Sequence, residues 1–205
     1  IRGFEPVLNE ETGKLPVIIR KAMSERKKLA SVPCGIWEKQ IFAGCFTLRE
    51  EKIVNTYDLP EFAYPEEKAE GEKYGFGVYS MFGHISPDYR RLLYLGTEGI
   101  KKRIEDKLLE VKEEKNVNFL KAAEISLEGL EIFGENHRQM LLKRAETCED
   151  KARKEELLAD AKALERVPKK PAATFFEACQ SVWLLHLALQ LTDNYLALGR
   201  PDQYL

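Results

Sequence analysis

The sequence predicts a mainly α-helical chain. Three observations support this fold class: apolar residues repeat at helical spacing from residue 86 onward, two segments there carry helix-start signals, and prolines and glycines collect in the residues before them. The chain has 205 residues, 44% hydrophobic and 32% charged, enough for one large core or two small ones. We divide it into an irregular part (1–85), a helical part (86–191) and a final segment (192–205).

The irregular part is punctuated by prolines and glycines, which disfavour long helices because proline removes a backbone donor and glycine admits positive φ. We expect one helix at about 17–30, followed by loops or short strands. Residues 36–46 are apolar enough to be partly buried, but their period is ambiguous between a helix and a strand, so no element is assigned there.

The helical part opens at Ser86-Pro87-Asp88, which supplies a hydroxyl cap, a proline at the first helical position and an acid near the positive end of the helix dipole. A helix of about 25 residues is expected there. A second should span about 117–149, with apolar residues from Phe119 to Cys148 on one face. The charges of a third, at about 150–165, alternate in sign as on a solvated surface, so no binding role is expected.

Thr174 and Glu177 form a capping-box pattern that starts a last helix, running to about Leu191. This helix is apolar on nearly all sides, so it should be buried on most of them. Such burial needs more protein than the other predicted helices supply. The chain also opens without Met and stops where an apolar run begins, so we expect a fragment of a longer protein.

Composition excludes several classes of function. Lys and Arg total 32 against 34 Asp and Glu, a net charge of -2, so no basic field attracts nucleic acid or an anionic membrane. No stretch is apolar enough to span a bilayer, and no signal-peptide layout is present. The four cysteines are too scattered for metal knuckles or a disulfide framework. We expect a soluble cytoplasmic protein with reduced thiols, no metal, and no nucleic-acid or membrane partner.

Three histidines are candidates for acid–base or binding roles. His137 and His186 sit among apolar neighbours inside predicted helices and are expected to be packing residues. His84 follows a glycine just ahead of a helix start, a setting that suits either a donor to a substrate oxygen or a histidine packing a loop. The glycines at 71–77 lack the spacing of a phosphate-binding loop.

The final segment, residues 199–205, carries Arg200, Asp202 and Gln203 on a turn beside the apolar helix. Such groups are costly to bury unless they bond to one another. We interpret them as a structural polar network.

Three segments together resemble glycyl radical enzymes of the pyruvate formate-lyase family. They are residues 82–91 (FGHISPDYRR), similar to a G-H-x-x-P-x-Y segment, residues 174–183 (TFFEACQSVW), similar to a T-F-x-E-A-x-Q-x-x-W helix, and residues 199–205 (GRPDQYL), similar to a G-R-x-D-Q-Y segment. They occur in the family's order and cover most of residues 80–205. Residues 1–79 match only loosely.

The resemblance implies the helical N-terminal part of a ten-stranded α/β barrel, with 192–205 as the start of the barrel, joined to the preceding helix by Arg200, Asp202 and Gln203. It implies radical elimination or bond cleavage on a small polar metabolite, a full-length homodimer in an anaerobic cytosol, and a separate activase that uses S-adenosylmethionine and an iron–sulfur cluster. The family's cysteine is followed two residues later by glutamate, whereas the cysteines here are followed by Ile36, Thr47, Asp150 and Ser181. The glycine-radical segment is also absent, so we expect no catalytic residue on this chain and no activity from it alone.

Subfamily features favour diol-dehydratase-like or uncharacterised members over pyruvate formate-lyase itself, which has an arginine where His84 stands. Asn194 falls where choline lyase and hydroxyproline dehydratase carry an aspartate, and an amide cannot act as a charged acceptor. We expect His84, Asn194 and Tyr195 to bind substrate. The alternative is a non-catalytic helical interaction module derived from the family.

Overall fold

A computed structural model describes residues 4–45, 59–74, 86–192 and 196–205. Within these ranges the chain forms helices and no strand, which confirms the mainly α prediction and shows nothing of the expected barrel. Short 3₁₀ helices lie at Thr12–Lys14 (η1) and Pro201–Gln203 (η2). The α-helices are α1 (Val17–Ser31), α2 (Pro65–Lys73), α3 (Tyr89–Leu108), α4 (Glu114–Thr147), α5 (Lys151–Arg166) and α6 (Phe175–Leu191).

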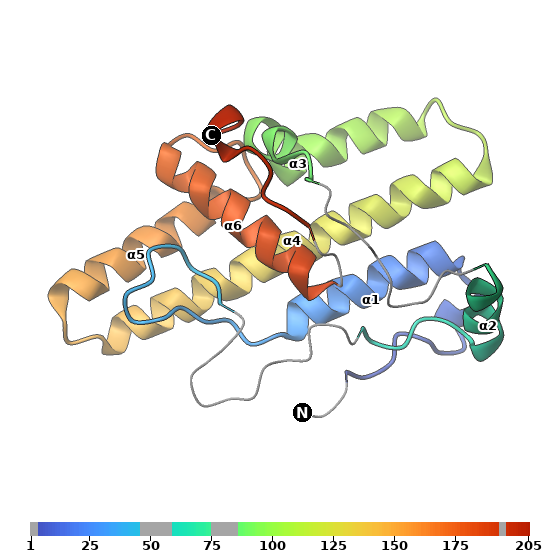
Figure 1. Ribbon diagram of the computed structural model, residues 1–205, viewed down its shortest axis with the longest axis horizontal. Helices are drawn as coiled ribbons and strands as arrows, with labels where there is room; N and C mark the ends of the chain where they lie inside the picture. The colour runs from blue at the N-terminus through green and yellow to red at the C-terminus, as the bar shows by residue number, and fades with distance from the viewer. Residues whose placement is uncertain (1–3, 46–58, 75–85, 193–195) are drawn as a thin grey trace.

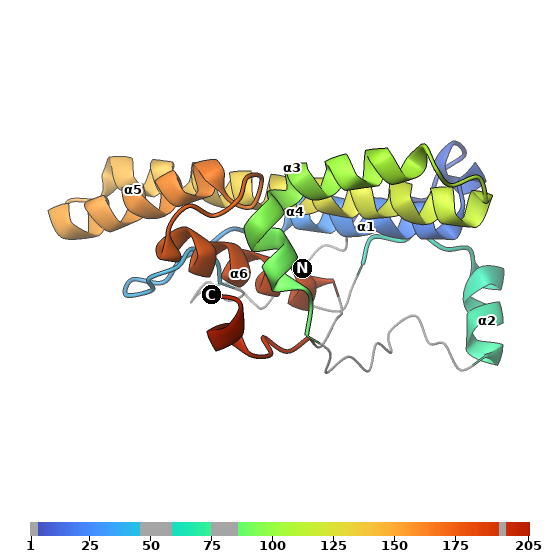
Figure 2. The same ribbon diagram turned by 90° about the horizontal axis from the view of Figure 1, so that it is seen from above.

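The long helix α4 is the axis of the fold. Helix α3 runs beside its N-terminal half, α1 beside its middle, and α5 folds back along its C-terminal half (Figure 1). Figure 2 shows these four helices as one layer, with α6 on one face of the layer and α2 standing at its edge. The main hydrophobic core lies where α6 meets this layer and includes Leu130, Phe133, Leu141, Leu164, Leu184 and Leu187.

Helix α6 is buried or half-buried along nearly its whole length, as its apolar sequence predicts. Of its residues only Phe175 is exposed, and the rest are buried or half-buried. Its buried Gln180 side chain accepts a hydrogen bond from the Ala43 backbone N–H (2.8 Å) and donates one to the Ala43 carbonyl (3.1 Å). This pair of bonds fastens the irregular segment after α1 to the core helix.

Helix α3 differs from the uninterrupted helix predicted from residue 86. It begins at Tyr89, with Asp88 as the capping residue, and it is kinked at Gly96, where φ is +63°. The segment after α5 inserts at the kink, and its Pro168 and Lys169 carbonyls accept bonds from the next two backbone amides of α3 at 2.9 and 3.0 Å. A Cβ on Gly96 would lie 2.2 Å from the Lys169 oxygen, so only glycine fits here.

Three further features differ from the predictions. Helix α2 was not predicted because Pro65 was interpreted as a break, yet it is the first helical residue, and the Glu67 carboxylate accepts a bond from the Tyr64 amide (2.8 Å). Phe119, predicted on the buried face of α4, is 59% exposed. One face of α5, predicted to be solvated, is buried, including Leu157 and Asp160. The strongly charged composition of α5 hid this narrow buried stripe.

Candidate functional site

The predicted substrate-binding residues His84, Asn194 and Tyr195 lie outside the described residues, so their roles stay predictions. The described residues that follow them meet in space. Gly199 has a φ of +69°, and a Cβ built on it would lie 2.3 Å from Ser86 Oγ. The segment that begins at Ser86 and the segment that contains Gly199 are therefore in contact, although they lie far apart in the sequence.

A buried tyrosine anchors this contact region. Tyr89, the first residue of α3, is 1% exposed, and its hydroxyl lies 3.2 Å from His186 Nδ1 on α6. Its ring stacks on Tyr204 with 5.2 Å between centroids, and the Tyr204 hydroxyl donates to the Leu198 carbonyl (2.7 Å). Burial raises the pKa of Tyr89 and lowers that of His186, so both groups are neutral near pH 7. The C-terminal segment is thus held against α3 and α6.

The predicted polar network is only partly visible in the described contacts. Arg200 and Asp202 form a two-bond pair, Nε to Oδ1 at 2.9 Å and Nη2 to Oδ2 at 2.7 Å, on the surface of the chain. The arginine bonds lower the pKa of Asp202. Gln203 contributes its backbone carbonyl, which accepts from Arg90 of α3 (2.7 Å). Residues 196–205 carry η2 and no strand, so the start of a barrel there stays a prediction.

His137 is a packing residue, as expected. It is 1% exposed on α4, its Nδ1 lies 2.9 Å from the Phe133 carbonyl oxygen, and its ring meets the Phe133 ring edge to face. Burial lowers its pKa to about 4, so the imidazole is neutral at physiological pH and lacks access to a substrate.

The four cysteines are half-buried and form no disulfide with one another. Burial raises the pKa of Cys34 to about 12 and also raises that of Cys179, which disfavours the reactive thiolate at these two positions. Among the described residues no group of His, Cys, Asp and Glu side chains could hold a metal ion. None of the described helices is long and apolar enough to cross a membrane.

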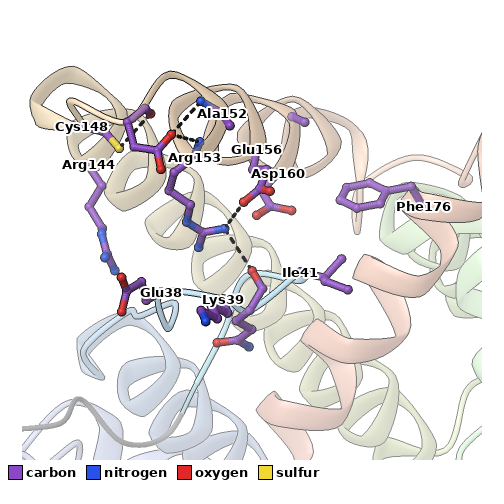
Figure 3. Close-up of a pocket in the computed structure, with 13 residues that line it drawn as sticks. Glu38, Lys39, Ile41, Arg144, Cys148, Ala152, Arg153, Glu156, Asp160 and Phe176 are labelled. Atoms are coloured by element: carbon purple, nitrogen blue, oxygen red, sulfur yellow. Dashed lines mark hydrogen bonds and ion pairs between the residues drawn. The ribbon is translucent and has the colours of Figure 1, made fainter.

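A pocket lies between α5, the C-terminal end of α4 and the segment at residues 38–41, with a volume of about 660 Å³ (Figure 3). Asp160 of α5 lines it and is 1% exposed. Sequence reasoning missed this residue. The signal was its spacing from Leu157 and Leu164, three and four residues away, which puts it on the same helix face as two buried leucines.

Comparison with known proteins adds the family. The family model described as pyruvate formate lyase-like matches residues 74–205, more than half of the chain. The chain belongs to this pyruvate formate-lyase-like family. The matched range contains the three segments on which the resemblance rests, together with α3 to α6.

Relatives of this pyruvate formate-lyase-like chain include lyases and a probable dehydratase. It is 34% identical over 126 residues to isethionate sulfite-lyase of Desulfovibrio desulfuricans, an alignment that covers 57% of this chain and 15% of the relative. It is 26% identical over 192 residues to the probable dehydratase YbiW of Escherichia coli, covering 88% and 22% respectively. The chain therefore spans less than a quarter of the length of these relatives.

Solved structures share the fold of this family member. The glycerol-bound B12-independent glycerol dehydratase from Clostridium butyricum matches with a TM-score of 0.75 at 21% identity, over 95% of this chain and 32% of that one. A glycyl radical enzyme from Archaeoglobus fulgidus gives a TM-score of 0.75 at 23% identity, with the same coverage. The helical arrangement is thus that of part of the glycyl radical enzyme fold.

Proposed function

We propose that this chain is the helical, substrate-side part of a glycyl radical enzyme that eliminates a group from, or cleaves a C–C or C–X bond in, a small polar metabolite. The observation that carries the proposal is the family match over residues 74–205, which contains all three quoted segments in full. The relatives named as a sulfite-lyase and a probable dehydratase favour cleavage or elimination.

In this proposal His84, Asn194 and Tyr195 bind the substrate. The contact between Ser86 and Gly199 supports it, because Ser86 follows His84 by two residues and Gly199 follows Tyr195 by four. Two residues of extended chain span at most about 7 Å, which supports a substrate site close to Ser86. Buried Tyr89, with the half-buried His186 and Tyr204, would form one wall of that region.

The radical residues belong, in this proposal, to polypeptide outside the 205 residues. None of the four cysteines has the family's glutamate two residues after it, and those at 34 and 179 are half-buried thiols with raised pKa values. The chain alone is then inactive. When present, the glycyl radical would supply hydrogen-atom abstraction through a cysteine, after installation by an S-adenosylmethionine and iron–sulfur activase in an anaerobic cytoplasm; the full-length enzyme would be a homodimer.

The test is to express the 205 residues together with the coding sequence on both sides of them. That product, incubated anaerobically with the activase, should show a glycyl radical by electron paramagnetic resonance and turn over a member of a panel of isethionate, glycerol, 1,2-propanediol and trans-4-hydroxyproline. The chain alone should show neither. A stop codon with no cysteine-x-glutamate or glycine-radical segment beyond it would refute the enzymatic role.

A second test addresses the substrate residues. His84→Ala in the full-length enzyme should lower kcat/KM by roughly tenfold or more, since a hydrogen bond to a substrate oxygen is lost, while the melting temperature changes little. Unchanged kinetics would remove His84 from the site.

One observation favours the alternative of a self-standing helical interaction module. Within this chain only Phe175 of α6 is exposed, and a module that folds by itself is expected to cover its apolar helix in this way. Cooperative unfolding of the isolated chain together with a genuine stop codon would select this alternative.

A further inference from the structure

The pocket of Figure 3 contains a buried acid with no bonding partner. Asp160 is 1% exposed, and neither of its carboxylate oxygens has a hydrogen-bond partner within the described residues. Buried polar groups are nearly always hydrogen-bonded, and an orphaned one costs free energy. Asp160 also borders a cavity of about 660 Å³, so a ligand that moves the neighbouring side chains aside can supply the missing donor.

The two arginines that line the pocket are directed elsewhere. Arg153 donates from Nη1 to the Gln40 carbonyl (3.2 Å) and to Glu156 (2.6 Å), and from Nη2 to the Trp37 carbonyl (2.9 Å). Arg144 donates from Nη1 to the Ile36 carbonyl (2.6 Å). These bonds hold both guanidinium groups on the segment around residues 36–40, which leaves the Asp160 oxygens without a donor.

The composition of the wall indicates the chemistry of a ligand. Acidic side chains outnumber basic ones, with Glu38, Asp150, Glu156 and Asp160 against Lys39, Arg144 and Arg153. In Figure 3, Phe176 and Ile41 lie to one side of the Asp160 carboxylate and Arg153 to the other. A ligand seated there therefore meets an acceptor that needs an N–H donor and, next to it, an apolar surface.

We propose that this pocket binds a small primary alkylammonium ion, whose N–H groups donate to Asp160 and whose alkyl chain packs against Ile41 and Phe176. The donor must carry hydrogen, because a quaternary ammonium would leave both carboxylate oxygens unsatisfied. The bond would be charge-assisted and shielded from water, and such bonds are about twice as strong as neutral ones.

The experiment is calorimetric titration of the 205-residue chain at pH 8 with n-butylammonium chloride. Two probes serve as controls: n-butanol has the alkyl chain without the charge, and tetramethylammonium has the charge without an N–H donor. Saturable binding is expected for n-butylammonium, and binding at least roughly tenfold weaker for both controls, the loss expected for a hydrogen bond to a charged group.

Variants separate Asp160 from general surface charge. Asp160→Asn should weaken n-butylammonium binding by roughly tenfold or more. Asp106→Asn, the same chemical change on the exposed face of α3, should leave binding unchanged. Circular dichroism of each variant checks that it folds. Because Asp160→Asn could fail to fold, amide NMR shifts of the unaltered chain form a second readout, and the largest should fall around residues 41, 160 and 176.

Four results would overturn the proposal: no saturable binding of n-butylammonium, equal affinity for tetramethylammonium, amide shifts confined to residues away from the pocket, or equal n-butylammonium affinity of a folded Asp160→Asn variant. The proposal does not depend on the proposed radical function, so either can fail without the other.

Discussion

Replacing Asp160 by leucine should stabilise the chain, and more so as the pH rises. The two side chains have nearly the same shape, so the substitution exchanges two unpartnered oxygens for two methyl groups in a site that is 1% exposed. Replacing buried charges by apolar groups of similar volume is often neutral or stabilising by about 1 to 4 kcal/mol.

The magnitude follows from the pKa of Asp160, which rises from 3.8 to about 7 through burial, with Arg153 lowering it and Glu156 raising it to smaller extents. Below about pH 4 the carboxyl group is protonated in both the folded and the unfolded chain. As the pH rises toward 7, the unfolded chain loses this proton first, so the free energy of unfolding falls, and it levels off above about pH 7. At 1.36 kcal/mol for each pKa unit, the fall is at most about 4 kcal/mol.

The assay is urea unfolding of the wild-type chain and of Asp160→Leu at pH 4, 6 and 8. Every other titrating group is common to both proteins, so the difference between their free energies of unfolding isolates Asp160. That difference should favour leucine at pH 8 and shrink toward pH 4. A difference independent of pH, or a leucine variant less stable at pH 8, would refute the reasoning.

Three substitutions test the fold. Gly96→Ala should lower the free energy of unfolding by roughly 2 kcal/mol or more, because alanine is strained at φ +63° and its Cβ meets the Lys169 carbonyl. Urea unfolding measures this loss, with Gly99→Ala in the regular part of α3 as the control. Equal losses in the two variants would count against the reasoning. Gln180→Leu should cost roughly 2 to 4 kcal/mol by leaving the Ala43 amide and carbonyl without partners, and a loss below about 1 kcal/mol would contradict this. Thr174→Ala should cost about 1 kcal/mol through the lost cap on α6, whereas Thr174→Ser should restore most of it.

The sequence predicted five of the described α-helices well because their signals are local. Caps, prolines and apolar spacing set α1, α4, α5 and α6 to within a few residues of their observed bounds. The position of the fifth helix, α3, was also predicted, but its kink at Gly96 was not. Helix α2 was missed although its signals were local too, since Pro65 can either break a helix or begin one.

For the candidate substrate site, the sequence could predict which segments take part but not how they are arranged. The quoted motifs pointed to the stretches around Ser86 and Gly199, and the fold brings these stretches into contact. The surface position of the Arg200–Asp202 pair was not predictable, because the same two residues could bond to each other in a core or in solvent. Periodicity shows which side of a helix faces inward, but it does not identify what lies opposite.

By itself the sequence determined the mainly helical class, the near-neutral net charge and the family motifs, all of which depend on residue types and near spacing. Tertiary structure alone decided that Gly96 admits a crossing segment and that Gln180 of α6 bonds to the backbone of Ala43. It also decided that Asp160, one acid among many on a charged helix, is buried without a partner. The burial and hydrogen bonding of a side chain depend on residues distant in sequence, and a local sequence pattern does not show which residues these are.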